Sequence, residues 1–297
     1  MENTRGSLFM VLAMAAFAIE DMFLKAAATH MPVGIALALF GLGGSAVFIA
    51  LTKRHDEQII HPELFTKPIM LRAAAEITGR LFFTLAITLT PLSSASAILQ
   101  ATPLVVVLGA ALLFGEQVGW RRWMAILIGF VGVLMIIRPG VDSFNPASIL
   151  AVISVLGFAG RDLATRAAPP VFSNRQLGVY GFLVLIPTGL ALHLYSGEGF
   201  YTSGMGLMQI TGTVIFGVIA YNALTVAMRT GDVSVVTPFR YTRLLFALVL
   251  AVLVFDETPD LITLAGGAIV VISGVYTLLC SRSKSRAAST KVLSNAR

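Results

Sequence analysis

Long apolar runs alternate with short polar connections along most of this chain. At about 20 apolar residues for each membrane crossing, the pattern predicts an all-α membrane protein with ten transmembrane helices. Prolines near the start of several runs agree with this division, because a proline in the first turn of a helix removes no backbone hydrogen bond. The predicted spans are 7–27, 32–52, 69–89, 92–113, 119–137, 147–168, 175–194, 205–228, 233–254 and 260–280.

The second half of the chain repeats the first at a constant offset. Asp21 corresponds to Asp162, 141 residues later, and Lys25 corresponds in the same way to Arg166. The sequence around these pairs also matches, with Phe-Ala before the aspartate and Ala-Ala after the basic residue in both copies. A fixed offset over a long stretch indicates duplicated architecture. Duplicated halves in a membrane protein are typical of carriers.

This repeat divides the chain into two units of five predicted spans each. The first repeat is predicted to cover 1–142 and the second 143–281, and the Ser-, Lys- and Arg-rich tail 282–297 is predicted to be disordered. Because five is an odd number, the second unit enters the membrane from the opposite side. The two units are therefore predicted to be inverted repeats, related by a pseudo-two-fold axis in the membrane plane.

Composition supports the membrane assignment and narrows the function. Hydrophobic residues make up 57% of the 297 residues and charged residues 12%, with a mean hydropathy of +0.86, whereas a soluble domain carries about 25% charge. The single cysteine, Cys280, excludes an intrachain disulfide and a metal–thiolate cluster, and we expect no metal or cofactor. The net charge of +6 does not indicate nucleic acid as a partner, because most basic residues fall in loops and in the tail.

The basic residues outside the spans also predict the orientation. Most of them fall on one side, which includes the loop 53–67 and the C-terminal tail, while the other side has only Lys25 and Arg138. Loops rich in Lys and Arg stay in the cytoplasm. We therefore expect a multi-pass protein of the inner membrane, surrounded by the lipid bilayer, with both termini in the cytoplasm.

Polar residues within the predicted spans are the candidate substrate-binding residues. Charges in hydrocarbon are costly, so each one should face a partner, a cavity or the interface. The alternative for each residue is a contact between helices. Glu76 and Arg80, four apart on one helical face, are expected to neutralise each other. The candidates are Arg80, Gln100, Thr102, Arg161, Tyr221, Asn222, Arg240 and Arg243.

Acidic residues and prolines within the spans lead to further predictions. Glu20 and Asp21 are expected near the outer interface, and the repeat-related Asp21 and Asp162 are expected to make a duplicated structural contact. Arginines within the spans outnumber the acids at the same depth, which favours a substrate with a carboxylate, because guanidinium matches carboxylate in charge and geometry. Pro103 and Pro238 lie within counterpart spans and are candidate hinges, the alternative being a fixed bend.

Both halves also share the sequence marks of a known family. The marks are Phe114-Gly-Glu116, Trp123, Gly129 and Gly132-Val133 in the first half, and Phe255-Asp-Glu257, Leu264, Gly266 and Gly274-Val275 in the second. Over almost its whole length the chain resembles the EamA module of the drug/metabolite transporter superfamily, and it is most similar there to the YddG-type exporters of aromatic amino acids. The resemblance implies a central cavity lined by spans one to four and six to nine. Spans five and ten then lie outside the cavity, as a candidate surface for a homo-oligomer, although a monomer is equally expected.

These observations predict a secondary transporter that exports small metabolites, with aromatic amino acids as the expected substrates, by alternating access. The alternatives are a broad-specificity exporter of drugs or cations and a channel-like facilitator. The sequence has no P-loop motif, which excludes ATP hydrolysis by that route. An intramembrane enzyme is disfavoured, because all four histidines fall at span ends or in loops and no His-Glu-x-x-His motif occurs.

Reporter fusions, or the accessibility of introduced cysteines, test the predicted topology. We expect both termini and the loop 53–67 to report a cytoplasmic location and the loop 139–146 an external one, because basic residues concentrate on the cytoplasmic side. Termini on opposite sides of the membrane would contradict the arrangement of five plus five inverted spans.

Overall fold

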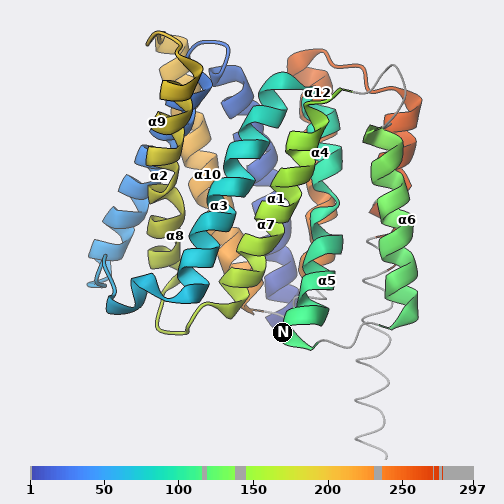
Figure 1. The fold of residues 1–297 in the computed structure, drawn as a ribbon, viewed down its shortest axis with the longest axis horizontal. Helices are drawn as coiled ribbons and strands as arrows, with labels where there is room; N and C mark the ends of the chain where they lie inside the picture. The colour runs from blue at the N-terminus through green and yellow to red at the C-terminus, as the bar shows by residue number, and fades with distance from the viewer. Residues whose placement is uncertain are drawn as a thin grey trace, which may run out of the picture.

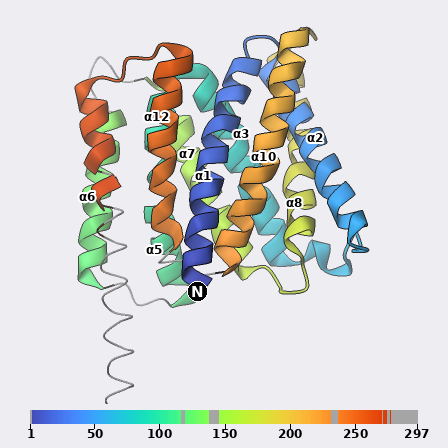
Figure 2. The same cartoon turned by 180° about the vertical axis from the view of Figure 1, so that it is seen from behind.

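The fold is a bundle of helices that run roughly alongside one another (Figure 1, Figure 2). The computed structural model describes residues 2–115, 119–137, 145–230, 236–269, 271–273 and 276. Within these ranges every regular element is a helix and none is a strand, which confirms the all-α prediction. The elements of the first half are α1 (Glu2–Ala27), α2 (Val33–Arg54), η1 (Pro62–Phe65), α3 (Lys67–Leu89), α4 (Leu92–Leu99), α5 (Thr102–Phe114) and α6 (Trp120–Ile137).

The second half continues the bundle. Its elements are α7 (Ser148–Ala167), α8 (Asn174–Leu183), α9 (Leu185–Ser196), α10 (Gly204–Thr230), η2 (Thr237–Tyr241), α12 (Thr242–Phe255) and a further apolar helix within Leu261–Ser273. Six segments of the described chain are long and apolar enough to cross a membrane: Thr4–Ala27, Val33–Arg54, Leu92–Phe114, Ser148–Ala167, Asn174–Ser196 and Gly204–Thr230. The total of ten crossings stays a prediction, and the predicted boundary near residue 142 and the tail 282–297 lie outside the described residues.

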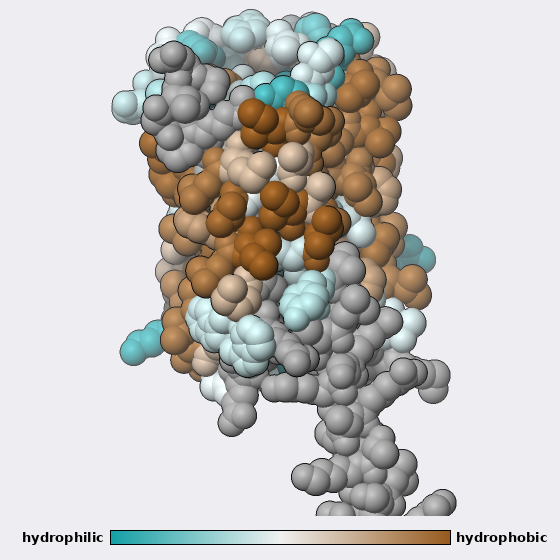
Figure 3. Space-filling model, turned by 90° about the vertical axis from the view of Figure 1, so that its right-hand side faces the viewer, coloured by the Kyte–Doolittle hydropathy of each residue, from teal (hydrophilic) through white to brown (hydrophobic). Residues whose placement is uncertain are grey.

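The outer surface of the bundle is apolar where a membrane would cover it. Figure 3 shows hydrophobic side chains across the middle of one face and hydrophilic ones gathered at its upper end. On α6, the side chains of Leu127, Phe130 and Val131 are each about half exposed. Lipid requires such a belt, because hydrocarbon offers no hydrogen bonds to exposed polar groups. Both ribbon views place α6 at the edge of the bundle, where the fifth span was expected.

The predicted span 92–113 is interrupted in its middle. It consists of α4 and α5, separated by a two-residue turn after Leu99. A continuous helix would need a backbone N–H at Pro103 for the carbonyl of Leu99, and the hydroxyl of Thr102 donates that hydrogen bond instead, at 2.7 Å. Pro103 therefore lies in the first turn of α5 rather than in a helix interior, which corrects its expected position.

In the described part of the counterpart span, predicted at 233–254, Val236 is α-helical and a 3-10 helix follows from Thr237. Pro238 lies in this segment, η2, which leads directly into α12, while residues 231–235 lie outside the described chain. A short 3-10 stretch beside an α-helix often marks a hinge. Both prolines thus lie at the start of a helical segment, and their role as hinges stays a prediction.

A close contact between α3 and α7 brings polar residues together. A Cβ atom added to Gly157 on α7 would lie 2.2 Å from the backbone nitrogen of Gly79 on α3, so the two backbones touch. Small residues allow this approach in membrane bundles. The charged residues in the middle of both helices lie within about one turn of this contact, and they therefore face each other across it.

Replacement of Gly157 by valine should destabilise the protein, because the added side chain would overlap the backbone of α3. Overpacking of this kind costs roughly 1–3 kcal/mol. The measurement is the melting temperature of the purified protein in detergent, with Gly160→Ala as the control. A Cβ at Gly160 meets only the side chain of Ala75, at 3.4 Å, so this variant should melt like the parent protein. Unchanged melting of Gly157→Val would contradict the contact.

Candidate functional site

A small cavity lies inside the bundle, beside the break between α4 and α5. Its volume is about 10 Å³, which is room for about one water molecule. The lining includes four residues that were predicted to bind substrate: Gln100, Thr102, Arg240 and Arg243. It is completed by Met14, Leu99 and Phe158. Charged donors, amide and hydroxyl groups and an aromatic ring therefore meet at one point in the interior.

Both arginines of the cavity are held by aspartates that the repeat relates. Arg243 donates from Nε to Oδ2 of Asp21 at 3.2 Å, and its Nη2 group bonds to the same oxygen. Arg240 donates from Nη1 to Oδ2 of Asp162. All four side chains are buried. Both aspartates thus bind arginines of one span, one helical turn apart. The two contacts are not copies of each other, because the repeat counterpart of Arg243, 141 residues earlier, is Thr102.

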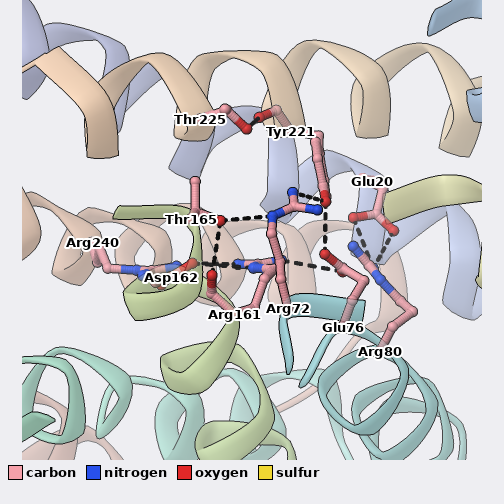
Figure 4. A network of polar contacts seen from close by, with 10 residues as sticks. All are labelled: Glu20, Arg72, Glu76, Arg80, Arg161, Asp162, Thr165, Tyr221, Thr225 and Arg240. Atoms are coloured by element: carbon pink, nitrogen blue, oxygen red, sulfur yellow. Dashed lines mark hydrogen bonds and ion pairs between the residues drawn. The ribbon is translucent and has the colours of Figure 1, made fainter. Parts of the chain in front are cut away.

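From Arg240 a hydrogen-bond network extends across the bundle (Figure 4). Asp162 bonds through Oδ1 to Arg161 at 3.0 Å, and Arg161 reaches Oε1 of Glu76 at 3.4 Å. Each of these residues is more than nine-tenths buried. The cavity is therefore connected through side chains to α3, on the far side of α7.

The other end of the network is built around Tyr221. Its hydroxyl donates to Oε2 of Glu76 at 2.8 Å and accepts from Nη2 of Arg72 at 2.5 Å. Arg72 also donates from Nε to the hydroxyl of Thr165 at 2.9 Å. The network thus joins α3, α7, α10 and η2, and each charge in it has a partner.

Arg80 belongs to a second cluster. Its Nη1 group donates to both carboxylate oxygens of Glu20, at 2.9 and 3.1 Å. The expected ion pair between Arg80 and Glu76 is therefore wrong, because Glu76 is turned toward α7 and α10 (Figure 4). Glu20 and Asp21, which were expected near the outer interface, are both 0% exposed and bind arginines of α3 and α12.

One member of the network, Arg72, is not among the predicted residues. It lies close to the start of the predicted span 69–89, where a basic side chain is expected to reach the interface, yet it is buried. The sequence feature that could have identified Arg72 is its spacing from Glu76 and Arg80, since residues four apart share one helix face. With Arg72 included, the described helices bury five arginines and four carboxylates.

Four of the predicted residues are not part of the cavity lining. Arg80, Arg161 and Tyr221 are buried in the two clusters instead. Asn222 is exposed, which corrects its predicted place at the cavity. Successive residues of a helix point about 100° apart, so Asn222 faces outward when Tyr221 faces the network.

Charged contacts join the two halves of the chain at one end of the bundle, beside an open pocket of about 560 Å³ that Ser93 and Glu257 help to line. Lys25 donates from Nζ to Oε1 of Glu257 at 3.1 Å and to the carbonyl of Thr90 at 3.2 Å. Glu257 also accepts from the backbone nitrogen of Leu92 at 2.8 Å, and from the backbone nitrogen and hydroxyl of Ser93 at 3.1 and 2.7 Å. The carboxylate therefore binds the N-terminus of α4. We name this set of contacts the end contact.

The end contact also sets the pKa of Glu257. Burial raises the pKa of this carboxyl, but the hydrogen bonds from Ser93 and Leu92 and the charge of Lys25 outweigh burial, so the pKa lies below its ordinary value. A lowered pKa means that the contact stabilises the fold fully above the pKa of the unfolded chain and is lost as the pH falls through the folded value. The end contact is therefore complete at neutral pH and weakens only in acid.

Comparison with known proteins identifies the family. Two segments of the chain, residues 4–138 and 145–280, match the EamA-like transporter family. This chain is an EamA-like transporter. The two matched segments correspond to the two repeats, and the predicted class of membrane transporter is confirmed.

The relatives of this EamA-like transporter carry different solutes. It is 24% identical over 209 residues, 70% of each chain, to the S-adenosylmethionine uptake transporter of Rickettsia felis. It is 27% identical over 285 residues, 95% of each chain, to the riboflavin transporter of Vibrio cholerae. It is 24% identical over 278 residues, 90% of this chain and 94% of that protein, to the pseudopaline exporter CntI of Pseudomonas aeruginosa. None of these three is named as an aromatic amino acid exporter, so the expected substrate stays a prediction.

A crystal structure of a protein has the same fold as this EamA-like transporter. The two superpose with a TM-score of 0.74 over 94% of this chain and 98% of that chain, at 19% sequence identity. This similarity concerns the arrangement of the helices and not the solute.

Replacement of Glu257 by glutamine should loosen the end contact of this transporter. The amide lacks the charge that pairs with Lys25 and that strengthens the hydrogen bonds from α4. A hydrogen bond to a charged group contributes ~1.5–3 kcal/mol, so the equilibrium between closed and open ends should shift roughly tenfold or more. The measurement is the labelling rate of Ser94→Cys by an impermeant maleimide, in a Cys280→Ser background.

Glu57→Gln is the matched control for this experiment. Glu57 forms an ion pair with Arg175, near the start of α8 and at the opposite end of the bundle (Figure 1). Its replacement should leave labelling at position 94 unchanged. If Glu257→Gln also left the labelling rate unchanged, the end contact would not hold this end closed.

Proposed function

We propose that this EamA-like transporter is a secondary carrier for a small organic solute that bears a carboxylate. The observation that carries the proposal is the pair of arginines, Arg240 and Arg243, in the lining of the cavity. A charged side chain inside a membrane bundle marks a substrate pathway by default. Guanidinium binds carboxylate through paired, charge-assisted hydrogen bonds, so these two side chains supply a site for an anionic group.

The two arginines have donors to offer a solute although each is held by an aspartate. Arg243 uses Nε and Nη2 on a single oxygen of Asp21, and Arg240 uses Nη1 on Asp162. A guanidinium has five N–H donors, and these contacts leave others for a ligand. The excess of one arginine over the buried carboxylates adds to the positive potential that an anion would meet.

The remaining walls of the cavity suit an apolar or aromatic group. Met14 and Leu99 are aliphatic, and Phe158 presents a ring that also lies 4.7 Å from the guanidinium carbon of Arg161. A solute with a carboxylate and an aromatic ring would use both kinds of wall once the bundle opens, because the closed cavity holds only about one water molecule. We therefore place aromatic amino acids first among the solutes, with export as the direction that the resemblance to YddG-type exporters implies. A cationic drug without a carboxylate is disfavoured, because the arginines would repel it and it has no anionic group to bind them.

The named relatives support a second class of solute. S-adenosylmethionine combines a carboxylate with a purine ring, and riboflavin is a flat system of fused rings. Guanidinium groups stack on aromatic faces, so the cavity also suits a solute of this kind. Uptake of a nucleoside-like or flavin-like solute is therefore the alternative to export of an aromatic amino acid.

We propose that transport proceeds by alternating access between inverted repeats, in the inner membrane with both termini in the cytoplasm. The breaks beside Pro103 and Pro238 lie in counterpart spans next to the cavity, which supports a hinge role for both prolines. The end contact joins the first repeat to the second at one end, as a closed gate requires. A bundle sealed at one end supports a carrier over a channel.

Counterflow in proteoliposomes tests the proposed function. Vesicles loaded with unlabelled L-phenylalanine should accumulate labelled L-phenylalanine transiently, which a channel cannot produce. Tryptophan, S-adenosylmethionine and riboflavin, added outside, then rank the solute classes by competition. Vesicles loaded with S-adenosylmethionine or with riboflavin test the alternative directly. Counterflow with none of these solutes would contradict the proposal.

Replacement of Arg243 by glutamine should weaken solute binding and transport. Glutamine keeps the capacity for hydrogen bonds but lacks the charge, and a charge-assisted hydrogen bond contributes ~1.5–3 kcal/mol, which is roughly 10- to 100-fold in affinity. The measurement is the initial counterflow rate against solute concentration, with size-exclusion chromatography to verify folding. Arg175→Gln, which removes an arginine from a surface ion pair, should transport at the rate of the parent protein. Full activity of Arg243→Gln would leave this arginine a structural role only.

A further inference from the structure

The two aspartates beside the cavity are held differently, although the repeat relates them. Asp162 uses both oxygens, Oδ1 with Arg161 at 3.0 Å and Oδ2 with Arg240. Asp21 uses only Oδ2, which is bonded to Arg243. Its Oδ1 is buried and has no hydrogen-bond partner among the residues that the structure describes. Asp21 therefore depends on one arginine, and that arginine lines the cavity.

Two arginines and two carboxylates form the cluster around Asp21. Arg243 comes from α12 and Arg80 from α3, while Glu20 precedes Asp21 on α1. Glu20 occupies Arg80 with both of its oxygens, at 2.9 and 3.1 Å. All four side chains are buried. The cluster is therefore balanced, with one arginine for each carboxylate.

Among the described residues of α10 and η2, the one charge close to this cluster is Arg240, which lines the same cavity as Arg243 and is paired with Asp162. On α10, which packs along α1 (Figure 2), the titratable residues are Tyr221, bonded into the network of Figure 4, and Arg229, bonded to a backbone carbonyl before α8. On η2, Arg240 bonds to Asp162, and Tyr241 packs against apolar side chains. The charge on Asp21 is thus balanced within its own cluster.

We propose that Asp21 takes up a proton when the solute binds, so that the carrier moves its solute together with a proton. This inference rests on the proposed function, in which the carboxylate of the solute binds Arg243. Once the solute neutralises Arg243, the two carboxylates of the cluster share one arginine. A buried carboxylate without a cation is far costlier than the neutral acid, so a proton enters. It enters at Asp21, because Glu20 keeps both oxygens on Arg80.

The net charge of the cluster, with the solute carboxylate and the proton included, is the same before and after the exchange. The solute carboxylate first binds the N–H groups of Arg243 that Asp21 leaves free and then displaces Asp21, so the ion pair between Arg243 and Oδ2 of Asp21 breaks and one between Arg243 and the solute forms. An O–H bond forms at Oδ1 of Asp21 with a proton from water. Release of the solute on the other side of the membrane reverses all three events. Solute and proton therefore travel in the same direction, so an inward proton gradient drives uptake, and export requires an outward solute gradient large enough to carry the proton out against it.

Asp162 is not expected to exchange a proton. Its network contains three arginines and two carboxylates, because Arg72, Arg161 and Arg240 face Glu76 and Asp162. If the solute also occupies Arg240, the two remaining arginines still balance the two carboxylates. The repeat-related aspartate thus provides a matched control within the same chain.

Infrared spectroscopy of the protein in nanodiscs tests the proposal without any solute. Arg243→Gln removes the partner of Asp21, so the C=O stretch of a protonated carboxylic acid should appear at neutral pH relative to the parent protein. The band should shift when aspartate is labelled with carbon-13, which separates Asp21 from Glu20, and it should be missing from Arg243→Gln/Asp21→Asn. Arg240→Gln should show no such band. A missing band in Arg243→Gln, or a band that does not shift, would overturn the proposal.

Transport by the parent protein gives a second test that does not depend on the folding of Arg243→Gln. Proteoliposomes hold a pH-sensitive dye, the voltage is clamped with potassium and valinomycin, and L-phenylalanine is added outside. Its entry should acidify the interior by one proton for each solute. Asp21→Asn should allow L-phenylalanine to enter without acidification of the interior. Glu57→Gln should behave like the parent protein.

The two tests separate the failure of this proposal from that of the proposed function. Entry of L-phenylalanine without acidification would overturn proton coupling and leave the carrier function intact. No entry of L-phenylalanine would count against the proposed solute, and the infrared result would still decide whether Asp21 is protonated on loss of its arginine.

Discussion

Neutralisation of buried charge between helices is the constraint on which this bundle depends. Five arginines and four carboxylates lie inside the described helices, and an isolated ion in so apolar a setting does not persist. The pairs tie α1 to α3 and α12, and they tie α3 to α7 and α10. A helix that shifts alone would separate opposite charges. The motions open to this transporter are therefore those that exchange one partner for another.

The fold follows from the sequence because long apolar runs have few solutions in a membrane. Predicted spans such as 32–52 and 147–168 therefore correspond closely to α2 and α7. Hydropathy does not show where a helix is interrupted, whereas the position of a proline does. The carbonyl four residues before Pro103 belongs to Leu99, where α4 ends, and the one four residues before Pro187 belongs to Leu183, where α8 ends. Both breaks can thus be read from one backbone rule.

The candidate site was predictable in its residues and not in their partners. Arg243 was expected at the cavity and lines it, because a charge in mid-membrane must face something polar. Glu20, by contrast, pairs with Arg80, 60 residues away, whereas spacing along the helix favours Glu76. Pairing between helices depends on how each helix is rotated about its axis, and a single sequence does not specify that rotation. For the same reason Tyr221 and its neighbour Asn222 could not be told apart until the orientation of α10 was known.

The side chains that bridge the break between α4 and α5 have a consequence for motion. Gln100 donates from Nε2 to the carbonyl of Ser96 at 3.0 Å, and Thr102 donates to that of Leu99 at 2.7 Å. Rotatable side chains, rather than the backbone ladder, satisfy both carbonyls. If the break acts as the predicted hinge, these side chains can rotate with the helical halves and keep the two carbonyls bonded in an apolar setting. The break lies at the wall of the cavity, so such a motion would change the shape of the cavity without unwinding a helix.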